Sequence, residues 1–541
     1  MPSNPFPLAT VPPSPSFTWP PQSVMVPLPM NTPGSAGLNL QQANQVLPPN
    51  WAIEAQNAVI DYAGRLAARL GISSASATAA PGQVRSIFEY RTPSGTSTQI
   101  VGYDGGISSS ISDPAGSSLV GTVASVASGR WLFQNFNGKC IGFQAGQKPI
   151  VLSTPTGTFS NVVETYGSAP QSGIGCAAYG RVWGIAADGQ TLQWCALLDE
   201  QNWGSGDSGS INLSEVWPSG VDTVTAIAAF NGSLVIFGLR QILFYGSSNG
   251  SATGLDVTSI ELVDTIEGTG CISQWTVAPV GQTDLLFCAQ IGVQSLGRLL
   301  VQKSRPTKEL SKYVRDTLIQ QLSAETAANV TGFYSPTQGF YALCLPVSGY
   351  VWVADQRHIF QDDMGDAVSP MTRWLLSLYA GVEFYNRTVY VTAPWSAGSI
   401  GIYNSVGSGD NGATFQYLVQ FPWTDFGGMN GPRLKAFKGM TATIQVPAQT
   451  SVTFQWFSDF TNIGRSFTVS TQGDAGAQWG VGQWGYDQWS GGALVQLLNN
   501  QLSGAGQYFS LQVSANTGGN FAIQQVTVLA KLLRIAYGTY T

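Results

Sequence analysis

The stretch Trp131–Phe143, WLFQNFNGKCIGF, decides the fold. It reads as an apolar strand, an Asn-Gly turn and a second apolar strand, the pattern of a β-hairpin. Ile227–Phe237, IAAFNGSLVIF, repeats it. Related phrases, aligned on the turn, fall at Tyr90, Phe136, Tyr179, Phe230, Val280, Tyr334 and Tyr385. Their spacing of roughly 43 to 54 residues is close to that of a four-stranded propeller blade. The sequence therefore predicts an all-β chain that contains a β-propeller of five to seven irregular blades.

The chain divides by composition into four regions. A length of 541 residues exceeds what one hydrophobic core usually supports. Residues 81–405 carry the repeated phrases and form the predicted propeller. Residues 406–541 lose the register and predict an additional antiparallel β module, a platform or tip. Residues 1–50 are rich in Pro and predict an extended arm, either a strap on a neighbouring subunit or a disordered tail. Residues 51–80 connect the arm to the propeller.

Few helices are expected. Trp51–Leu70 predicts an amphipathic helix, or a helix followed by a turn at Asp61–Gly64, with Arg65 and Arg69 on one helical face. Residues 308–329 predict a helical insertion that packs outside the propeller or marks a contact between subunits. Its apolar stripe, at spacings of four, begins with Leu310, Val314, Leu318 and Leu322.

Charge is scarce in this chain. Charged residues make up 10% of it, against about 25% in ordinary domains, and the net charge is −6. No basic field is available to hold nucleic acid tightly, which disfavours a sequence-reading DNA-binding protein but permits a passage through which DNA slides. A weakly charged polar surface suits a subunit locked into an assembly; a secreted protein with a neutral surface is the alternative.

Cysteine usage and hydropathy limit the setting. The six cysteines stand mostly singly among apolar strand residues and are interpreted as small buried hydrophobes in preference to disulfides or metal ligands. They are Cys140, Cys176, Cys195, Cys271, Cys288 and Cys344. No segment has the 18 or so consecutive apolar residues of a membrane helix, and the N-terminus does not resemble a secretory signal. Synthesis and assembly in a cytoplasm are expected.

No catalytic, cofactor-binding or metal-binding residue is predicted, although three segments invite the question. Asp355–Asp366, DQRHIFQDDMGD, contains His358, the only histidine. A metal site or a catalytic dyad would need the side chains of this segment to converge on one point. A solvated loop is the favoured interpretation. Asp188 is interpreted as a turn residue before Gly189. Gly204–Gly209, GSGDSG, fits a nucleotide-binding fingerprint formally but opens no helix, which favours a flexible loop between strands.

Three tryptophans are the candidate contact residues. Gln478–Gly492, QWGVGQWGYDQWSGG, places Trp479, Trp484 and Trp489 five residues apart on a Gly-rich segment. Indole rings contribute large apolar area with few rotors to freeze, so they are expected to be contact anchors. The alternative is that they fill a local core beneath the loop.

Two regions carry a resemblance to a known family. They are GSAGLNLQQANQVLPPNWAIEAQNAVIDYAGRLAARLG from Gly34 to Gly71, and Gly175–Arg315. The second contains GCAAYGRVWGIAADGQTLQWCALLD from Gly175, VTAIAAFNGSLVIFGLRQILFYG from Val224 and GTGCISQWTVAPVGQTDLLFCAQIGVQSL from Gly268. Together they resemble the tail nozzle family of short-tailed bacteriophages, also called tail tubular protein B or packaged DNA stabilization protein. The Pro-rich first thirty residues and the Trp segment have no counterpart in it.

The resemblance implies a structural protein of the virion, assembled in the cytoplasm of a bacterial host. It implies a propeller with a platform module, present as a hexameric ring below the portal and adaptor proteins. The ring would retain packaged double-stranded DNA and form the distal ejection channel, contacting tail fibre, spike or needle proteins.

Two other classes of function stay open. One is a receptor- or glycan-binding tail propeller in which the Trp segment and blade loops contact a cell-surface sugar. The less favoured one is a propeller glycoside hydrolase, which would need paired carboxylates at a fixed separation.

Overall fold

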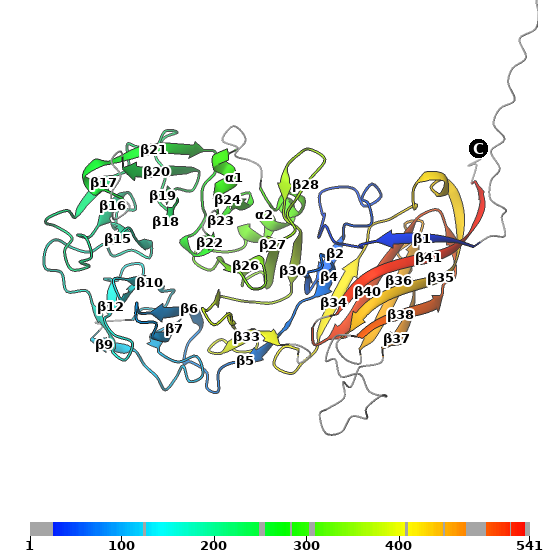
Figure 1. The fold of residues 1–541 in the computed structure, drawn as a ribbon, viewed down its shortest axis with the longest axis horizontal. Helices are drawn as coiled ribbons and strands as arrows, with labels where there is room; N and C mark the ends of the chain where they lie inside the picture. Colours follow the sequence, from blue (N-terminus) through cyan, green and yellow to red (C-terminus); the bar gives the residue numbers. More distant parts are fainter. Residues whose placement is uncertain are drawn as a thin grey trace, which may run out of the picture.

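The computed structural model describes residues 25–535, except 123–125, 248–254, 282–283, 302–308, 406–408, 447–449, 472–493 and 520. Figure 1 shows two parts, a ring of small sheets and a two-layer β-sandwich beside it. No helix among the described residues is both long and apolar enough to cross a bilayer.

Within the described residues, seven sheets follow one another around the ring. From the inner strand outward they are β6–β8 (Val84–Arg91, Ser97–Tyr103, Gly106–Ser108); β10–β13 with β9 (Leu132–Phe136, Lys139–Phe143, Ile150–Leu152, Phe159–Asn161, Val120–Thr122); β14–β17 (Gly175–Ala178, Arg181–Ile185, Thr191–Trp194, Gly209–Asn212); β18–β21 (Ala226–Phe230, Ser233–Phe237, Gln241–Ser247, Ile260–Glu267); β22–β24 (Ala278–Val280, Asp284–Ala289, Gly292–Ser295); β25–β27 with β30 (Thr331–Ser335, Phe340–Leu345, Tyr350–Asp355, Met371–Trp374); and β31–β33 with β5 (Gly381–Glu383, Val389–Thr392, Ile400–Ser405, Gly71–Ser74).

The inner strands close the ring. Strand β6 contacts β10, β10 contacts β14 and β14 contacts β18; β22 contacts β25, β25 contacts β31, and β31 returns to β6. A shared apolar cluster joins the sheets of β18 and β22, with Phe237 and Phe287 ring centroids 5.0 Å apart. This is a β-propeller, and the predicted fold class is confirmed.

Each repeated phrase of the sequence lies at the turn between the two innermost strands of one sheet. Asn137 and Gly138 have φ of 46° and 71°, and Asn231 and Gly232 have 48° and 81°. Two successive residues with positive φ are what a type I′ hairpin turn requires, and Asn-Gly is the pair that adopts it with least strain. The local turn chemistry therefore sets the period of the propeller.

A strand from before the first blade completes the last one. Strand β5 pairs antiparallel with β33, with Ile72 opposite Tyr403. Ile72 is fully buried in a cluster that includes Tyr403 and Trp374. The two ends of the propeller segment are thus held in one sheet.

The second part of the molecule is the β-sandwich, which we call the platform. Its first sheet has the order β3-β4-β41-β35-β38, with β1 on β41 and β39 on β35; its second has the order β2-β34-β40-β36-β37. One apolar cluster includes buried side chains of both sheets, such as Val526 and Val513. The strands are β1 (Met25–Asn31), β2 (Glu54–Gln56), β3 (Ala58–Ile60), β4 (Leu66–Ala68), β34 (Phe415–Gln420), β35 (Arg433–Val446), β36 (Ser451–Ser458), β37 (Arg465–Ser470), β38 (Leu494–Gln501), β39 (Ala505–Gly506), β40 (Phe509–Thr517) and β41 (Ala522–Ile535).

A continuous sheet joins the propeller to the platform. Strand β2 pairs with β30 of the propeller on one side and with β34 of the platform on the other, which gives the nine-stranded order β25-β26-β27-β30-β2-β34-β40-β36-β37. The platform therefore combines strands from both ends of the described chain, and the propeller is inserted between them.

The N-terminal expectations need two corrections. Residues 25–31, within the predicted arm, form a strand that pairs with Gln525–Lys531 of the same chain, neither a strap on a neighbour nor a disordered tail. Trp51–Leu70 contains β2, β3 and β4 in place of a helix, although the chain does turn at 62–64. Alternate residues of β3 are buried, so sheet packing overrides the helical periodicity that the sequence suggested.

The helical insertion is shorter than predicted and lies inside the chain's own packing. It consists of the 3-10 turn η3 (Lys312–Val314) and helix α2 (Arg315–Ser323). Val314 and Leu318 are fully buried in the same cluster as Leu343, and Gln321 accepts a hydrogen bond from Trp352 Nε1 at 2.6 Å. The apolar stripe is confirmed, and α2 packs against β24, the outermost strand of its blade. A short helix α1 (Leu296–Val301) and a hairpin of β28 (Phe360–Gln361) and β29 (Ala367–Val368) were not predicted.

Candidate functional site

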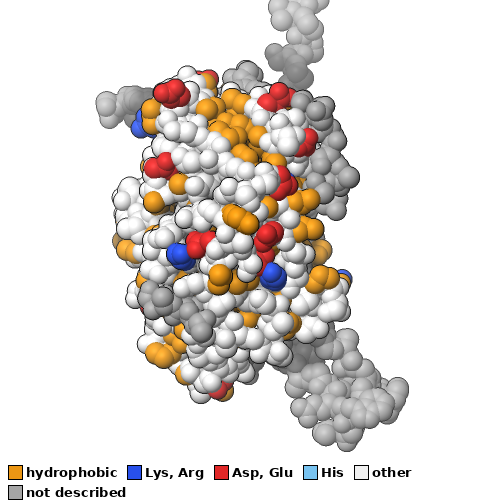
Figure 2. All heavy atoms as spheres, turned by 90° about the vertical axis from the view of Figure 1, so that its left-hand side faces the viewer, with side chains coloured by type: hydrophobic (Ala, Val, Ile, Leu, Met, Phe, Trp, Pro, Cys, Tyr) orange, Lys and Arg blue, Asp and Glu red, His pale blue; other side chains and the backbone are white. Residues whose placement is uncertain are grey.

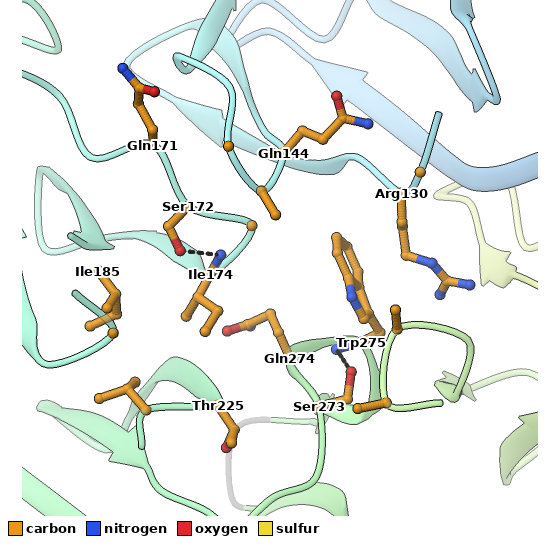
Figure 3. Close-up of a pocket in the computed structure, with 18 of the residues that line it drawn as sticks. Arg130, Gln144, Gln171, Ser172, Ile174, Ile185, Thr225, Ser273, Gln274 and Trp275 are labelled. Atoms are coloured by element: carbon orange, nitrogen blue, oxygen red, sulfur yellow. Dashed lines mark hydrogen bonds between the residues drawn. The ribbon is translucent and has the colours of Figure 1, made fainter. Parts of the chain in front are cut away.

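A large cavity opens at the propeller face where the inner strands begin. Its volume is about 710 Å³. Its walls are the segments that precede β10, β14, β18, β22 and β25, together with the loops that follow β11 and β15. In Figure 3 the labelled side chains surround this space from several successive sheets. The cavity therefore belongs to the axis of the propeller and not to any one sheet.

The walls of this axial cavity are neutral apart from one residue. Of the residues that line it, Arg130 alone is ionisable, and none is Asp or Glu. Trp275 follows Gln274 in the 3-10 turn η2 (Gln274–Thr276), whose cap is the Ser273 hydroxyl. The Gln274 amide accepts from Ile227 N at 2.7 Å and donates to Ile227 O at 3.1 Å, which fixes η2 against the neighbouring sheet.

A second, smaller cavity of about 140 Å³ adjoins the first, since Arg130 and Trp275 line both. Its other walls come from the starts of β6, β10, β25 and β31. The Arg130 guanidinium lies over the Trp275 ring at 5.2 Å and donates to Tyr379 O at 2.6 Å. Burial, with a smaller effect of Arg85, lowers the pKa of Arg130 to about 9.

The acidic segment Asp355–Asp366 combines ion pairs with an exposed turn. Asp355 is buried; it pairs with Arg357 at 2.6 Å, and its other oxygen lies 3.1 Å from His358 Nδ1. Asp362 accepts from Lys312 at 2.6 Å and from the Tyr313 hydroxyl at 3.1 Å. Burial alone would raise the pKa of Asp362, but these hydrogen bonds outweigh it and the pKa is lowered. The prediction of a solvated loop holds for residues 361 and 363–365, which are exposed, whereas the carboxylates of Asp355 and Asp362 each have a cation within reach.

The other two segments behave as predicted in their local structure. Asp188 accepts from the backbone N–H of Gln190 and of Thr191, each at 2.9 Å, and Gly189 has φ of 70°, so Asp188 is a turn residue. Residues 204–208 lie in the connection between β16 and β17, and Gly209 is the first residue of β17. Among the described residues, no group of three or more His, Cys, Asp or Glu side chains is placed to hold a metal ion. All six cysteines are buried and unpaired with one another.

The two arginines of the N-terminal segment have separate roles. Arg65 pairs with Asp61 at 2.6 Å in the turn between β3 and β4. Arg69 is 1% exposed and makes a two-point contact with Asp410, at 2.8 and 2.5 Å. Its Nε donates to Asn57 at 3.1 Å, and its guanidinium lies 3.8 Å from the Phe415 ring centroid. Arg69 thus links the start of the propeller segment to β34, the first platform strand that follows the propeller in the chain.

Two surface strands expose apolar side chains at the edges of their sheets. Strand β38 ends its sheet among the described strands and exposes Val495 and Leu497 by 53% and 63%. Strand β21 is the outer strand of its blade and exposes Val263 by 61%. Figure 2 shows the propeller side away from the platform, with few charged side chains and scattered apolar ones. Such edges offer unpaired backbone groups to another strand.

The predicted contact anchors Trp479, Trp484 and Trp489 lie outside the described residues. The sequence reading did not single out Arg130 or Trp275. The sequence does contain a signal for Arg130. It is a single Arg directly before the apolar strand of a repeated phrase, at the point where an inner strand of the propeller begins. No comparable signal marks Trp275.

The fold and the cavities define a β-propeller joined through a shared sheet to a β-sandwich. No family model matches the chain, and no curated protein matches it. Among solved structures, the AfRom2 CNH domain is similar at 10% identity and a TM-score of 0.28, over 52% of this chain and 86% of that one. Hsv2 of Kluyveromyces lactis is similar at 7% identity and a TM-score of 0.28, over 51% of this chain and 82% of that one.

Proposed function

We propose that this chain is a structural virion protein, the tail nozzle of a short-tailed bacteriophage. In this proposal a hexameric ring of it lies below the portal and adaptor proteins, retains packaged DNA and conducts it during ejection without reading its sequence. Fibre, spike or needle proteins contact the distal end. The proposal begins from the resemblance of Gly34–Gly71 and Gly175–Arg315 to that family.

One structural observation carries the proposal furthest. The resembling segment Gly34–Gly71 contains β2 and Arg69, the elements that join the propeller to the platform. A nozzle subunit has to pass load between its ring neighbours and the DNA that it retains, so its two modules must move as one body. A sheet shared by both modules and a buried ion pair between them supply that rigidity.

The surface supports a permanent assembly. A closed ring needs two different complementary faces on each subunit. The edge strands β21 and β38 lie on different modules, and each exposes apolar side chains. Charged residues make up only 10% of the chain, so copies repel one another weakly.

The direct test is quantitative mass spectrometry of purified particles from a lysate that carries this gene, with copies counted against the portal protein. About one copy for every two portal chains is expected for a six-fold nozzle on a twelve-fold portal. Absence from the particles would refute the proposal. A ratio three or more times higher would point to fibres or spikes.

A glycan-binding propeller is the second candidate, and the axial cavity is the observation that favours it. Its neutral walls and Trp275 could hold the apolar face of a sugar ring. Binding of the purified chain on a glycan array, lost in Trp275→Ala, would support this function. Hydrolysis of the sugar has no support at this cavity, because no carboxylate lines it.

A further inference from the structure

The smaller axial cavity carries an excess of positive charge. Arg85 and Arg130 both line it. Arg85 pairs with Asp104 at 2.8 Å, and the same carboxylate oxygen accepts from Gly129 N at 2.8 Å. In the part of the chain that the structure describes, no carboxylate is paired with Arg130, whose side chain is 9% exposed. One guanidinium charge is therefore buried at the axis without a counter-charge.

Two hydrogen-bond donors that belong to residues lining this cavity lack a partner. Arg130 Nε and Trp131 Nε1 are both buried and make no hydrogen bond in the structure. Leaving a buried donor unpaired costs about 1–3 kcal/mol, so each such group calls for an explanation. No acceptor of the lining side chains is left unpaired, and the deficit is of acceptors only.

The backbone contact of Arg130 does not remove this deficit. Tyr379 O accepts from Arg130 Nη2 and also from Thr331 Oγ1 at 3.0 Å, so it is a neutral acceptor shared by two donors. The aromatic face of Trp275, 5.2 Å from the guanidinium carbon, adds only a weak attraction. Water could accept from the two free donors but would not neutralise the charge.

We propose that this cavity is a binding site for a small oxyanion of the size of phosphate or sulfate. The anion accepts from Arg130 and Trp131 and supplies the charge that the walls lack. A volume of about 140 Å³ is far more than the ~10–15 Å³ that one water needs, so the cavity has room for a small anion. The anion would link the starts of β6, β10, β25 and β31 across the axis and so stabilise the ring closure.

Titration of the full chain with inorganic phosphate, by isothermal calorimetry at fixed ionic strength, tests the site. One phosphate per chain is expected, with a melting temperature that rises with phosphate concentration as mass action requires. Arg130→Met should weaken binding by a factor of about 10 or more, the usual strength of a charged hydrogen bond. This variant should fold, because Tyr379 O keeps its bond from Thr331 and the apolar stem is replaced.

Arg240→Met is the matched control, since it removes the same charge from an exposed position of the propeller. It should bind phosphate as the unmodified chain does. Trp131→Phe removes one donor and keeps most of the ring, so a smaller loss, about threefold, is expected. Absence of saturable binding to the unmodified chain would overturn the proposal, as would equal binding by Arg130→Met. An equal loss in Arg240→Met would assign the binding to surface charge and overturn it as well.

Discussion

At the scale of single residues, the contrast between Arg65 and Arg69 shows how position decides the value of a charge. Both lie in one short segment, and both form an ion pair. The Arg65–Asp61 pair is about one-fifth exposed at each residue, whereas Arg69 is 1% exposed. An exposed ion pair contributes little to stability because water screens it. Removing one partner of a buried ion pair is costly, because the other charge stays buried without a partner.

Arg69→Met should therefore lower the free energy of unfolding by about 3 kcal/mol, because it leaves the Asp410 carboxylate without its cation. Arg65→Met, the control, should cost less than about 1 kcal/mol. Chemical denaturation of both variants measures the difference. In the double variant Arg69→Met/Asp410→Asn, part of the loss should be recovered; a fully additive loss would contradict the assignment of a coupled pair.

The buried cysteine thiols limit the folding stability of the protein at alkaline pH. Burial raises the pKa of Cys271 to about 11 and those of Cys176, Cys195 and Cys344 to about 12, from 9.0. The folded chain keeps these protons at pH values where the unfolded chain releases them. Folding stability should consequently fall as the pH rises above about 9.

Measurements of unfolding at pH 8 and pH 10 should show this loss, and Cys344→Ala should reduce its slope. Iodoacetamide should label the native chain negligibly at pH 8 and label it at six positions in denaturant, since all six cysteines are buried. Rapid labelling of any one cysteine in the native chain would contradict the structure at that residue.

At the scale of elements, the Asn-Gly turns are the points where local chemistry fixes a blade. A Cβ added to Gly232 would meet no atom within 4 Å, so only its φ of 81° opposes a side chain. Gly232→Ala should cost about 1–2 kcal/mol of stability from backbone strain alone. Gly232→Asn should cost clearly less, because Asn tolerates the left-handed conformation. Thermal unfolding compares the two variants; equal costs would show that φ is not the cause.

The parts of the fold that could be predicted are those in which local pattern and packing agree. The repeated phrases indicated the positions of all seven inner hairpins, because two apolar strands joined by a tight turn are stable as neighbouring strands of one sheet. Trp51–Leu70 could not be read in this way, because its strands pair with partners hundreds of residues away, such as β34 and β41. The same holds for Asp362, whose partner Lys312 lies 50 residues before it. The axial cavity depends on the convergence of many blades, and no single segment encodes it.

At the scale of the whole molecule, the closing strand and the shared sheet make the two modules one cooperative unit. Ile72→Asp would place a carboxylate in a fully buried cluster beside Tyr403 and Trp374. It should lower the melting temperature of the entire chain in one calorimetric transition, by about 4 °C for a loss of ~4–5 kcal/mol, because a cooperative unit of 541 residues has an unfolding entropy of about 1.1 kcal/mol/K. Two separate transitions would show that the modules unfold independently.

The insertion of the propeller between the strands of the platform also sets the order of events during translation. Strand β1 pairs with residues 525–531, so it has to wait for almost the whole chain to leave the ribosome. At about 5–20 residues per second, the 493 residues between Asn31 and Gln525 take roughly 25 to 100 seconds. The propeller can fold during that time, whereas the central platform strand β41 arrives last. A polypeptide released before β41 is synthesised would lack the strand that pairs with β1, β4 and β35, so the first sheet of the platform could not form and any assembly through that sheet would select for chains that contain β41.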